Sequence, residues 1–171
     1  MAIHAIEETS QMTDPAKGFM FELIFENLFG EGGITGEQIE LRAQSYTLPG
    51  ESVSETSMSL AGYERRDSGL VTKGGDWSTQ IIETQNYDTI KRFESWIDIM
   101  HDYSSGVTGL SSEYKTDIQI NALNAKKEVI LKRKLRRAWP KNISEMTYGP
   151  RDDKAINVRI TWRYDWWETV K

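Results

Sequence analysis

The sequence contains no cysteine, and this absence excludes disulfides, thiolate nucleophiles and thiolate metal ligands. Histidine is almost as scarce, because only His4 and His101 occur. Neither has a second histidine at metal-ligand spacing, and no serine stands in a recognisable catalytic frame with either of them. We therefore predict no catalytic residue, no metal site and no cofactor site, and we do not expect an enzyme.

Long apolar runs are absent as well. The longest apolar cluster, residues 18–25 (GFMFELIF), is interrupted by Glu22 and is much shorter than the roughly 18–20 apolar residues of a membrane-spanning helix. Residues 1–15 lack the basic region and the apolar region of a secretory signal. We expect a protein that has no membrane anchor and is made in the cytoplasm.

Two loops superficially resemble ligand-binding motifs. The glycine-rich segment GEGGITGE, residues 30–37, lacks the Gly-Lys-Ser/Thr ending of a phosphate-binding loop, and Glu31 and Glu37 would repel a phosphate. The RDD sequence at residues 151–153 follows a Gly-Pro pair, where aspartate is typical of a turn. We interpret both segments as connecting loops.

Charge of both signs is present but unevenly distributed along the chain. The net charge is −5, yet residues 1–58 hold ten acidic and two basic residues, whereas residues 126–141 hold eight basic residues and one acidic residue. Such asymmetry is typical of surfaces that steer or meet a partner of opposite charge.

Alternating apolar and polar residues predict strands in the first half of the chain. Residues 19–29 and residues 37–50 are expected to pair as a hairpin that closes at Leu48-Pro49-Gly50. Further along, the pattern predicts a strand at residues 57–64, a flexible loop or loose hairpin at residues 67–76, and a strand at residues 77–84.

The spacing changes between residues 86 and 103, where apolar residues recur at three- and four-residue intervals: Tyr87, Ile90, Phe93, Trp96 or Ile97, and Met100. This period predicts an amphipathic helix. Three further strands are expected, at residues 114–124, 129–139 and 156–167.

The predicted order of elements indicates the fold class. No internal repeat or linker is visible, so we expect an N-terminal arm at residues 1–18 and one domain at residues 19–171. The class is α+β and mainly β, an antiparallel sandwich or barrel-like domain with one flanking helix.

Three interpretations of the basic segment LKRKLRR, residues 131–137, are open. On a strand, Lys132, Lys134 and Arg136 would share one face, with Arg133 and Arg137 on the other. The cations could form a solvated face, or residues 126–141 could be a nucleic-acid-binding module, which usually adds exposed aromatic residues. The third interpretation is a contact with the acidic first third of an identical chain.

Several motifs, taken in order and spacing, resemble those of a known family. They are LPG at residues 48–50, DWSTQIIE at 76–83, RFESWIDI at 92–99, SEYKTDIQI at 112–120, RRAWPKNISEM at 136–146 and YDWWE at 164–168. Together they resemble the tail tube (inner tube) proteins of contractile-tailed bacteriophages over most of the chain, from Phe19 to Glu168. The most specific element is an expected turn between two strands, which contains Trp139, Pro140, Asn142 and Glu145.

The resemblance implies a structural protein of the virion tail. In that family, subunits form hexameric rings, and one sheet from each subunit joins its neighbours into a continuous barrel around a lumen. The rings stack into a hollow tube that conducts DNA into the host during tail contraction. Expected partners are other copies of the chain, the tail sheath, the baseplate or tube initiator, and the tail terminator.

Related proteins leave two alternatives open. The chain could be a tube-initiator protein of the baseplate, or an inner-tube subunit of a related contractile injection machine such as a type VI secretion system.

The tube hypothesis assigns roles to two sets of residues. A conduit should not bind DNA tightly, because retained phosphate contacts slow passage, so polar and acidic residues on outward strand faces suit the lumen. The candidate lumen-lining residues are Gln38, Glu40, Gln44, Ser57, Ser59, Asp117, Gln119 and Asn121. The candidate subunit-interface residues are the cations Lys132, Lys134 and Arg136 and the arm residues Glu7, Glu8 and Asp14.

If these cations hold subunits together, assembly should weaken as salt is added, because ions screen contacts between surface charges. The measurement is sedimentation of the purified protein, with negative-stain microscopy, over a range of salt concentrations. Assembly that does not respond to salt would contradict this role.

Overall fold

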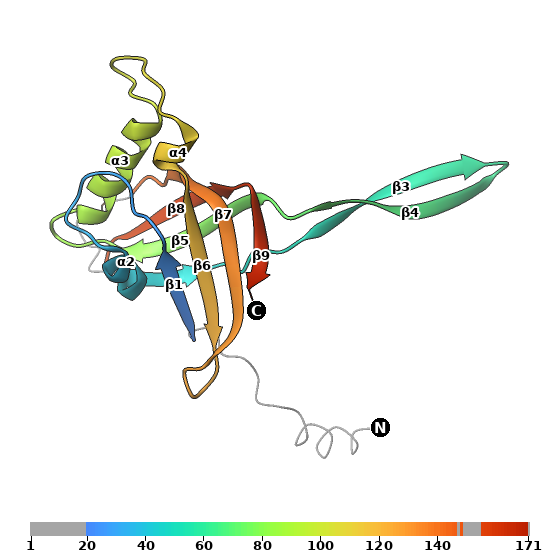
Figure 1. Ribbon diagram of the computed structural model, residues 1–171, viewed down its shortest axis with the longest axis horizontal. Helices are drawn as coiled ribbons and strands as arrows, with labels where there is room; N and C mark the ends of the chain where they lie inside the picture. Colours follow the sequence, from blue (N-terminus) through green and yellow to red (C-terminus); the bar gives the residue numbers. More distant parts are fainter. Residues whose placement is uncertain (1–19, 147, 149–154, 171) are drawn as a thin grey trace.

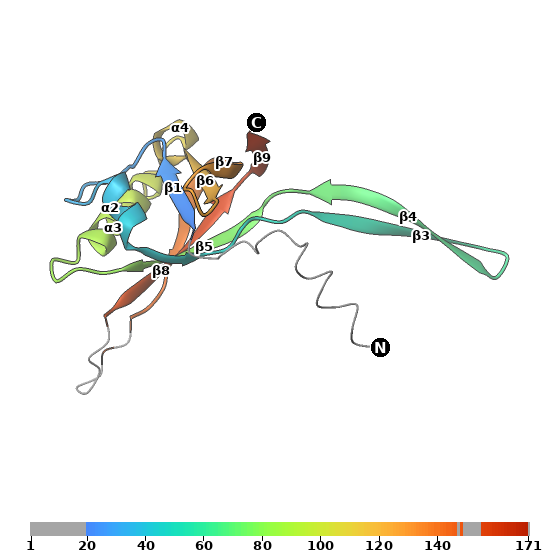
Figure 2. The same cartoon turned by 90° about the horizontal axis from the view of Figure 1, so that it is seen from below.

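A computed structural model describes residues 20–146, 148 and 155–170, and most of them lie in antiparallel strands (Figure 1). The predicted N-terminal arm, residues 1–18, therefore lies outside the described residues. The strands of the body are β1 (Phe21–Phe25), β2 (Ala43–Tyr46), β5 (Gly75–Ile82), β6 (Thr116–Leu123), β7 (Val129–Ile143), β8 (Asn157–Tyr164) and β9 (Trp166–Val170). The helices are α2 (Gly36–Arg42), α3 (Asp88–Met100) and α4 (Ser111–Tyr114). A hairpin of β3 (Ser52–Leu60) and β4 (Tyr63–Thr72) projects away from the body in both views (Figures 1 and 2).

Strand β7 connects the two halves of the body sheet. The strand order is β1-β6-β7-β8-β5-β2, and β9 also pairs with β7. The first part of β7 pairs with β6 and β9, whereas residues 139–143 pair with β8. Between these parts the register slips at Arg137, whose φ is 55°. This bulge bends the strand, so that β7 leaves the first half-sheet (β1, β6, β7, β9) and enters the second (β2, β5, β8).

The hydrophobic core lies between the apolar faces of the half-sheets and helix α3. Its centre is Trp162 of β8, which is fully buried. The Trp162 ring lies 5.5 Å from that of Phe93 and 5.6 Å from that of Trp96, both on α3, and 6.2 Å from that of Trp77 on β5. The expected alternation of residues 157–164 is confirmed, because the apolar members of that strand are all buried.

Helix α3 confirms the predicted amphipathic segment, although it is shorter than residues 86–103. Its buried face includes Phe93 and Trp96. The carboxylate of Glu83 accepts hydrogen bonds from the backbone N–H groups of Thr89 (3.3 Å) and Ile90 (3.1 Å), which satisfies donors in the first turn. With this helix and the antiparallel strands, the fold class predicted from the sequence is confirmed.

The predicted strand at residues 37–50 is wrong in its first half, which forms helix α2. A capping box starts that helix: Gln38 N–H donates to Thr35 Oγ1 (3.3 Å), and Thr35 N–H donates to Gln38 Oε1 (3.1 Å). The helix buries Ile39 but leaves Leu41 85% exposed, so the two residues do not share a face as a strand requires. The expected hairpin is also wrong, because β1 pairs with β6 and β2 pairs with β5.

The segment at residues 67–76, predicted to be a flexible loop or a loose hairpin, is mostly strand. β4 pairs with β3 along its length, and the two strands are joined at Ala61 (φ 51°) and Gly62 (φ 85°). Positive φ at both central residues is the geometry of a tight two-residue hairpin turn.

The C-terminal predictions need two corrections. The single strand expected at residues 156–167 is divided at Asp165 into β8 and β9, which belong to different half-sheets. The turn expected at Trp139–Glu145 is not a turn: Trp139, Pro140 and Asn142 lie within β7. Proline is tolerated there because the end of β7 is an edge with a second register shift, between Pro140 and Asn142.

Replacing the central core tryptophan should be much more damaging than replacing an exposed one. We expect Trp162→Ala to lower the free energy of unfolding by about 3–5 kcal/mol, because it leaves a cavity among four aromatic rings. Trp166, which is 45% exposed, provides the matched control, Trp166→Ala. Urea unfolding curves measure both variants, and equal losses would contradict the position of the core.

Candidate assembly surfaces

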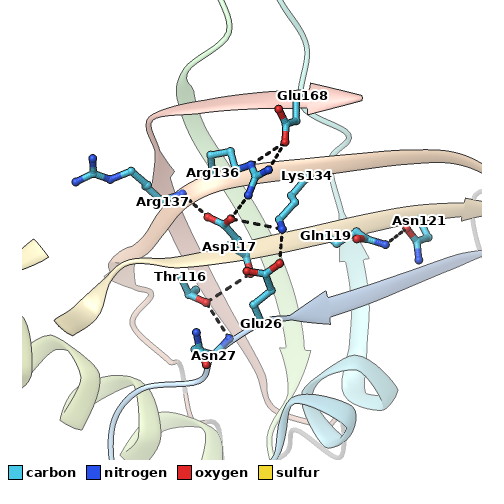
Figure 3. A network of polar contacts seen from close by, with 10 residues as sticks. All are labelled: Glu26, Asn27, Thr116, Asp117, Gln119, Asn121, Lys134, Arg136, Arg137 and Glu168. Carbon is cyan, nitrogen blue, oxygen red and sulfur yellow. Dashed lines mark hydrogen bonds and ion pairs between the residues drawn. The ribbon is translucent and has the colours of Figure 1, made fainter. Parts of the chain in front are cut away.

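The outer face of the first half-sheet is polar and carries charges of both signs (Figure 3). Side chains alternate along each strand, so the residues that flank the buried Leu23, Ile118, Ile120 and Leu135 point outward. The outward residues are Glu22 and Ile24 of β1, Asp117, Gln119 and Asn121 of β6, Lys132, Lys134 and Arg136 of β7, and Trp166 and Glu168 of β9.

Asp117 is the centre of a charged network on this face (Figure 3). Its Oδ1 accepts from the backbone N–H of Arg137 at 2.9 Å, and its Oδ2 accepts from Arg136 Nη1 at 2.5 Å and lies 3.5 Å from Lys134 Nζ. Burial alone would raise the pKa of Asp117, but these hydrogen bonds and the two cations more than offset it and lower the pKa. The carboxylate thus binds the bulge of β7 directly.

The network continues to both edges of the half-sheet. Lys134 also pairs with Glu26, which follows β1, and Arg136 also pairs with Glu168 of β9, with Nε–Oε1 and Nη2–Oε1 distances of 2.7 and 2.5 Å. Hydrogen bonds to Asp117 and Glu168 raise the pKa of Arg136. Four strands or their ends are therefore linked by alternating acids and bases.

A second charged cluster holds the point where β8 becomes β9. The Asp165 backbone N–H donates to Arg136 O at 3.1 Å, and its carboxylate pairs with Lys115 at 3.2 Å and with Arg137 at 3.3 Å. Both positions at which the chain changes half-sheet, Arg137 and Asp165, are therefore joined to each other.

The candidate interface cations lie together on this face, and two of them have partners within the chain. Lys134 and Arg136 form the ion pairs described above, whereas Lys132 has no ion pair within the described part of the chain. Glu7, Glu8 and Asp14 lie outside the described residues. A role for the three cations between subunits stays a prediction.

The candidate lumen-lining residues do not form one surface in a single chain. Gln38 and Glu40 lie on helix α2 rather than on a strand, where burial, followed by the nearby Glu22, raises the pKa of Glu40. Asp117, Gln119 and Asn121 share the polar face of β6 with the interface cations, and Asn121 is buried there, donating to Glu22 Oε2 at 2.6 Å. The other three are Gln44 on β2 and Ser57 and Ser59 on β3.

The β3–β4 hairpin is a second candidate surface. From here on we call this hairpin the arm; it is distinct from the N-terminal arm expected at residues 1–18. All residues of β3 are exposed, and so are nearly all of β4. One face carries Met58, Leu60 and Tyr63, of which Leu60 is 73% and Tyr63 is 83% exposed. The other face is polar, with Arg66 paired to Glu55 at 3.4 Å and to Glu64 at 3.1 Å. The arm therefore ends in an apolar tip on one face.

Sequence reasoning missed the arm tip and the acids Glu26 and Glu168. The signal for the arm was present, because Gly62 lies between two segments of similar length, and glycine is favoured in a tight two-residue turn. No local signal identifies Glu26 as a partner of Lys134, since the two are 108 positions apart.

Within residues 20–146, 148 and 155–170, no group of three or more His, Asp or Glu side chains is placed to hold a metal ion. In the same part of the chain, no helix is both long enough and apolar enough to cross a membrane.

Removing the charge of Asp117 should weaken the fold and change its response to acid. We expect Asp117→Asn to lower the free energy of unfolding by about 1.5–3 kcal/mol at neutral pH, because Arg136 and Lys134 lose a charged acceptor. The folded pKa of Asp117 lies below its ordinary value of 3.8, so its ionised form stabilises the fold above that pH. This stabilisation is lost as the pH falls through the folded pKa. Because asparagine does not titrate, the free energy of unfolding of Asp117→Asn should fall less than that of the original protein as the pH is lowered.

Urea unfolding between neutral pH and about pH 3 measures this effect. The control is Asp67→Asn on the exposed arm, where the Asp67–Arg65 pair (3.1 Å) should contribute less than about 1 kcal/mol. An Asp117→Asn protein with an unchanged slope of stability against pH would contradict the account.

Comparisons with known proteins agree with this fold. A family model described as phage tail tube protein matches residues 16–170. Comparison with curated protein sequences gave no match.

Solved structures of low sequence identity share the architecture. The chain superposes on a chain of the anti-feeding prophage cap (AFP tube terminating cap) with a TM-score of 0.67 and 14% identity, over 100% of this chain and 99% of that chain. The PVC sheath/tube terminator of an extracellular contractile injection system in the extended state superposes with a TM-score of 0.66 and 14% identity, over 93% of this chain and 99% of that chain. The PVC sheath-tube complex superposes with a TM-score of 0.61 and 14% identity, over 96% of this chain and 97% of that chain. At 14% identity the structural similarity shows the fold alone. The family model spans nearly the whole sequence, and the chain therefore belongs to the phage tail tube protein family.

Proposed function

We propose that this protein is the subunit of a phage tail tube, in which hexameric rings stack into a hollow conduit for DNA. The observation that carries the proposal is the arm, which projects from the body with both of its faces and both of its edges uncovered by the described residues (Figures 1 and 2). An isolated two-stranded hairpin is only marginally stable in water. A second chain that covers the arm would supply the missing contacts.

The composition of the arm favours another copy of this chain as that partner. Its tip presents Met58, Leu60 and Tyr63 on one face, and burying an exposed apolar side chain contributes about 1.5–3 kcal/mol. The contact is between unlike surfaces, tip and body, and such a heterologous contact generates rings or open helical stacks.

The polar face of the first half-sheet suits the wall of a DNA conduit. Lys134 and Arg136 are each held by acids of the same chain, so they offer little unpaired positive charge to phosphates. Gln119 and Asn121 add neutral polar groups beside them. We therefore place Asp117 and Gln119 at the lumen. The pairing of Lys134 and Arg136 also weakens the case for a nucleic-acid-binding module at residues 126–141, although Lys132 has no ion pair among the described residues.

The proposal extends to location and partners. A tail tube subunit belongs to the virion tail, is assembled in the host cytoplasm, and meets the sheath, the baseplate initiator and the terminator. Joining of the first half-sheets between neighbouring copies would cover the free edges of β1 and β9, which single chains leave unpaired among the described strands.

A second candidate function is a protein that ends or starts the tube. It is favoured by the similarity in fold to the anti-feeding prophage tube terminating cap and to the PVC sheath/tube terminator. Negative-stain microscopy of the purified protein separates the two candidates: long tubes support a tube subunit, single rings support a tube-end protein, and a persistent monomer at high concentration contradicts both.

Removing the apolar tip should weaken assembly without unfolding the chain. We expect the triple variant Met58→Thr, Leu60→Thr, Tyr63→Thr to need a more than about tenfold higher concentration to assemble, because three apolar side chains no longer dock. Threonine keeps the strand propensity of the arm. Sedimentation and electron microscopy measure assembly, and circular dichroism measures folding.

The matched control replaces three exposed apolar residues outside the arm. Tyr103, Val107 and Leu110 lie in the α3–α4 connection and are exposed to a similar extent (64–95%, against 48–83% for the tip residues), so their threonine variant tests for a general loss of surface hydrophobicity. Normal tubes from the tip variant would contradict the proposed role of the arm.

A further inference from the structure

The root of the arm, residues 47–51 and 73–74, is held by side chains of three body strands. Residues 47–50 lie between β2 and β3 and have no strand partner, so their carbonyl groups need other donors. Three side chains supply them: Trp77 Nε1 donates to Thr47 O (2.5 Å), Arg133 Nη1 donates to Pro49 O, and Trp167 Nε1 donates to Gly50 O (2.9 Å).

Two of these donors also pack against each other. The guanidinium of Arg133 lies 4.3 Å from the centre of the Trp167 ring, and Lys73 Nζ, from the second leg of the arm, lies 4.9 Å from it. Cations over an indole ring are attracted by its π electrons. Lys73 also pairs with Glu51 at 3.6 Å, which ties the two legs together. Arg133 thus contacts the first leg of the arm through Pro49, and Trp167 contacts both legs, through Gly50 and Lys73.

The second leg passes close to the body where β8 becomes β9. A Cβ added at Gly74 would lie 2.7 Å from the carbonyl oxygen of Asp165, so only glycine allows this approach. Both legs of the root therefore contact the body, whereas the strands of the arm beyond the root are exposed.

We propose that Arg133 and Trp167 are positioning residues that set the direction in which the arm leaves the body. β3 has nine residues and is about 30 Å long, so a rotation of about 10° at its root moves the tip by about 5 Å. The consequence for assembly rests on the proposed function of the arm. The inference also assigns a physical role to two sequence motifs, because LPG at residues 48–50 meets the second tryptophan of YDWWE.

Spin-label distances test the direction of the arm. The chain has no cysteine, so single labels can be introduced at exposed Ser59 near the tip and at exposed Ala125 or Glu94 on the body. Pulsed electron paramagnetic resonance then measures the Ser59–Ala125 and Ser59–Glu94 distances, with the labelled chain diluted in excess unlabelled chain.

The test variants are Arg133→Met, which removes the donor and the cation, and Trp167→Phe, which keeps an aromatic ring but removes the N–H group. Their controls are the adjacent residues on the opposite face, Lys132→Met and Trp166→Phe. We expect both test variants to shift or broaden the distances by about 5 Å, and Arg133→Lys to restore them in part, since lysine keeps a cation and a donor.

The outcomes separate this inference from the proposed function. Unchanged distances in Arg133→Met and Trp167→Phe, or equal changes in the two controls, would overturn the inference. If Arg133→Met does not fold, as judged by circular dichroism, Trp167→Phe decides by the same criterion. A displaced arm in a variant that still forms normal tubes supports the positioning role of the root and overturns the proposed role of the arm in assembly.

Discussion

The hydrogen bond from the Arg137 backbone N–H to the Asp117 carboxylate is the contact on which the rest of the structure depends. It holds the bulge at which β7 turns from one half-sheet into the other, so that one strand of 15 residues serves both. Because Asp165 at the second crossing binds Arg136 O and the Arg137 side chain, the two bends form a single corner. The corner joins the two half-sheets whose apolar faces contribute to the core around Trp162.

The arm and the body are stabilised in different ways. The body is stabilised by a core of buried aromatic and aliphatic side chains, whereas the arm buries almost nothing within its own chain. What connects the two is the root, where hydrogen bonds and cation–π contacts replace the missing strand pairing. A root held by these contacts, with an uncovered hairpin beyond it, is an arrangement suited to reaching a second molecule.

The elements that could be predicted from the sequence are those with one buried face. Residues 157–164 alternate because β8 packs one side on the core, and α3 shows its helical period for the same reason. The alternation of Ile39, Leu41 and Ala43 imitated a strand, and the capping box at Thr35 and Gln38 was the signal that outweighed it. The arm has no buried face, so periodicity carries little information about it. The break at Asp165 depends on partners far away in the chain.

The candidate surfaces divide in the same way. The sequence by itself determined that thiol chemistry is absent, where charges of each sign are concentrated, and that Lys132, Lys134 and Arg136 share one face. Only the tertiary structure decided that Lys134 and Arg136 are neutralised within the chain, and that Arg133, on the opposite face, binds the root of the arm. The reason is that alternation records which face a side chain occupies, whereas its partners depend on which distant strands lie next to it.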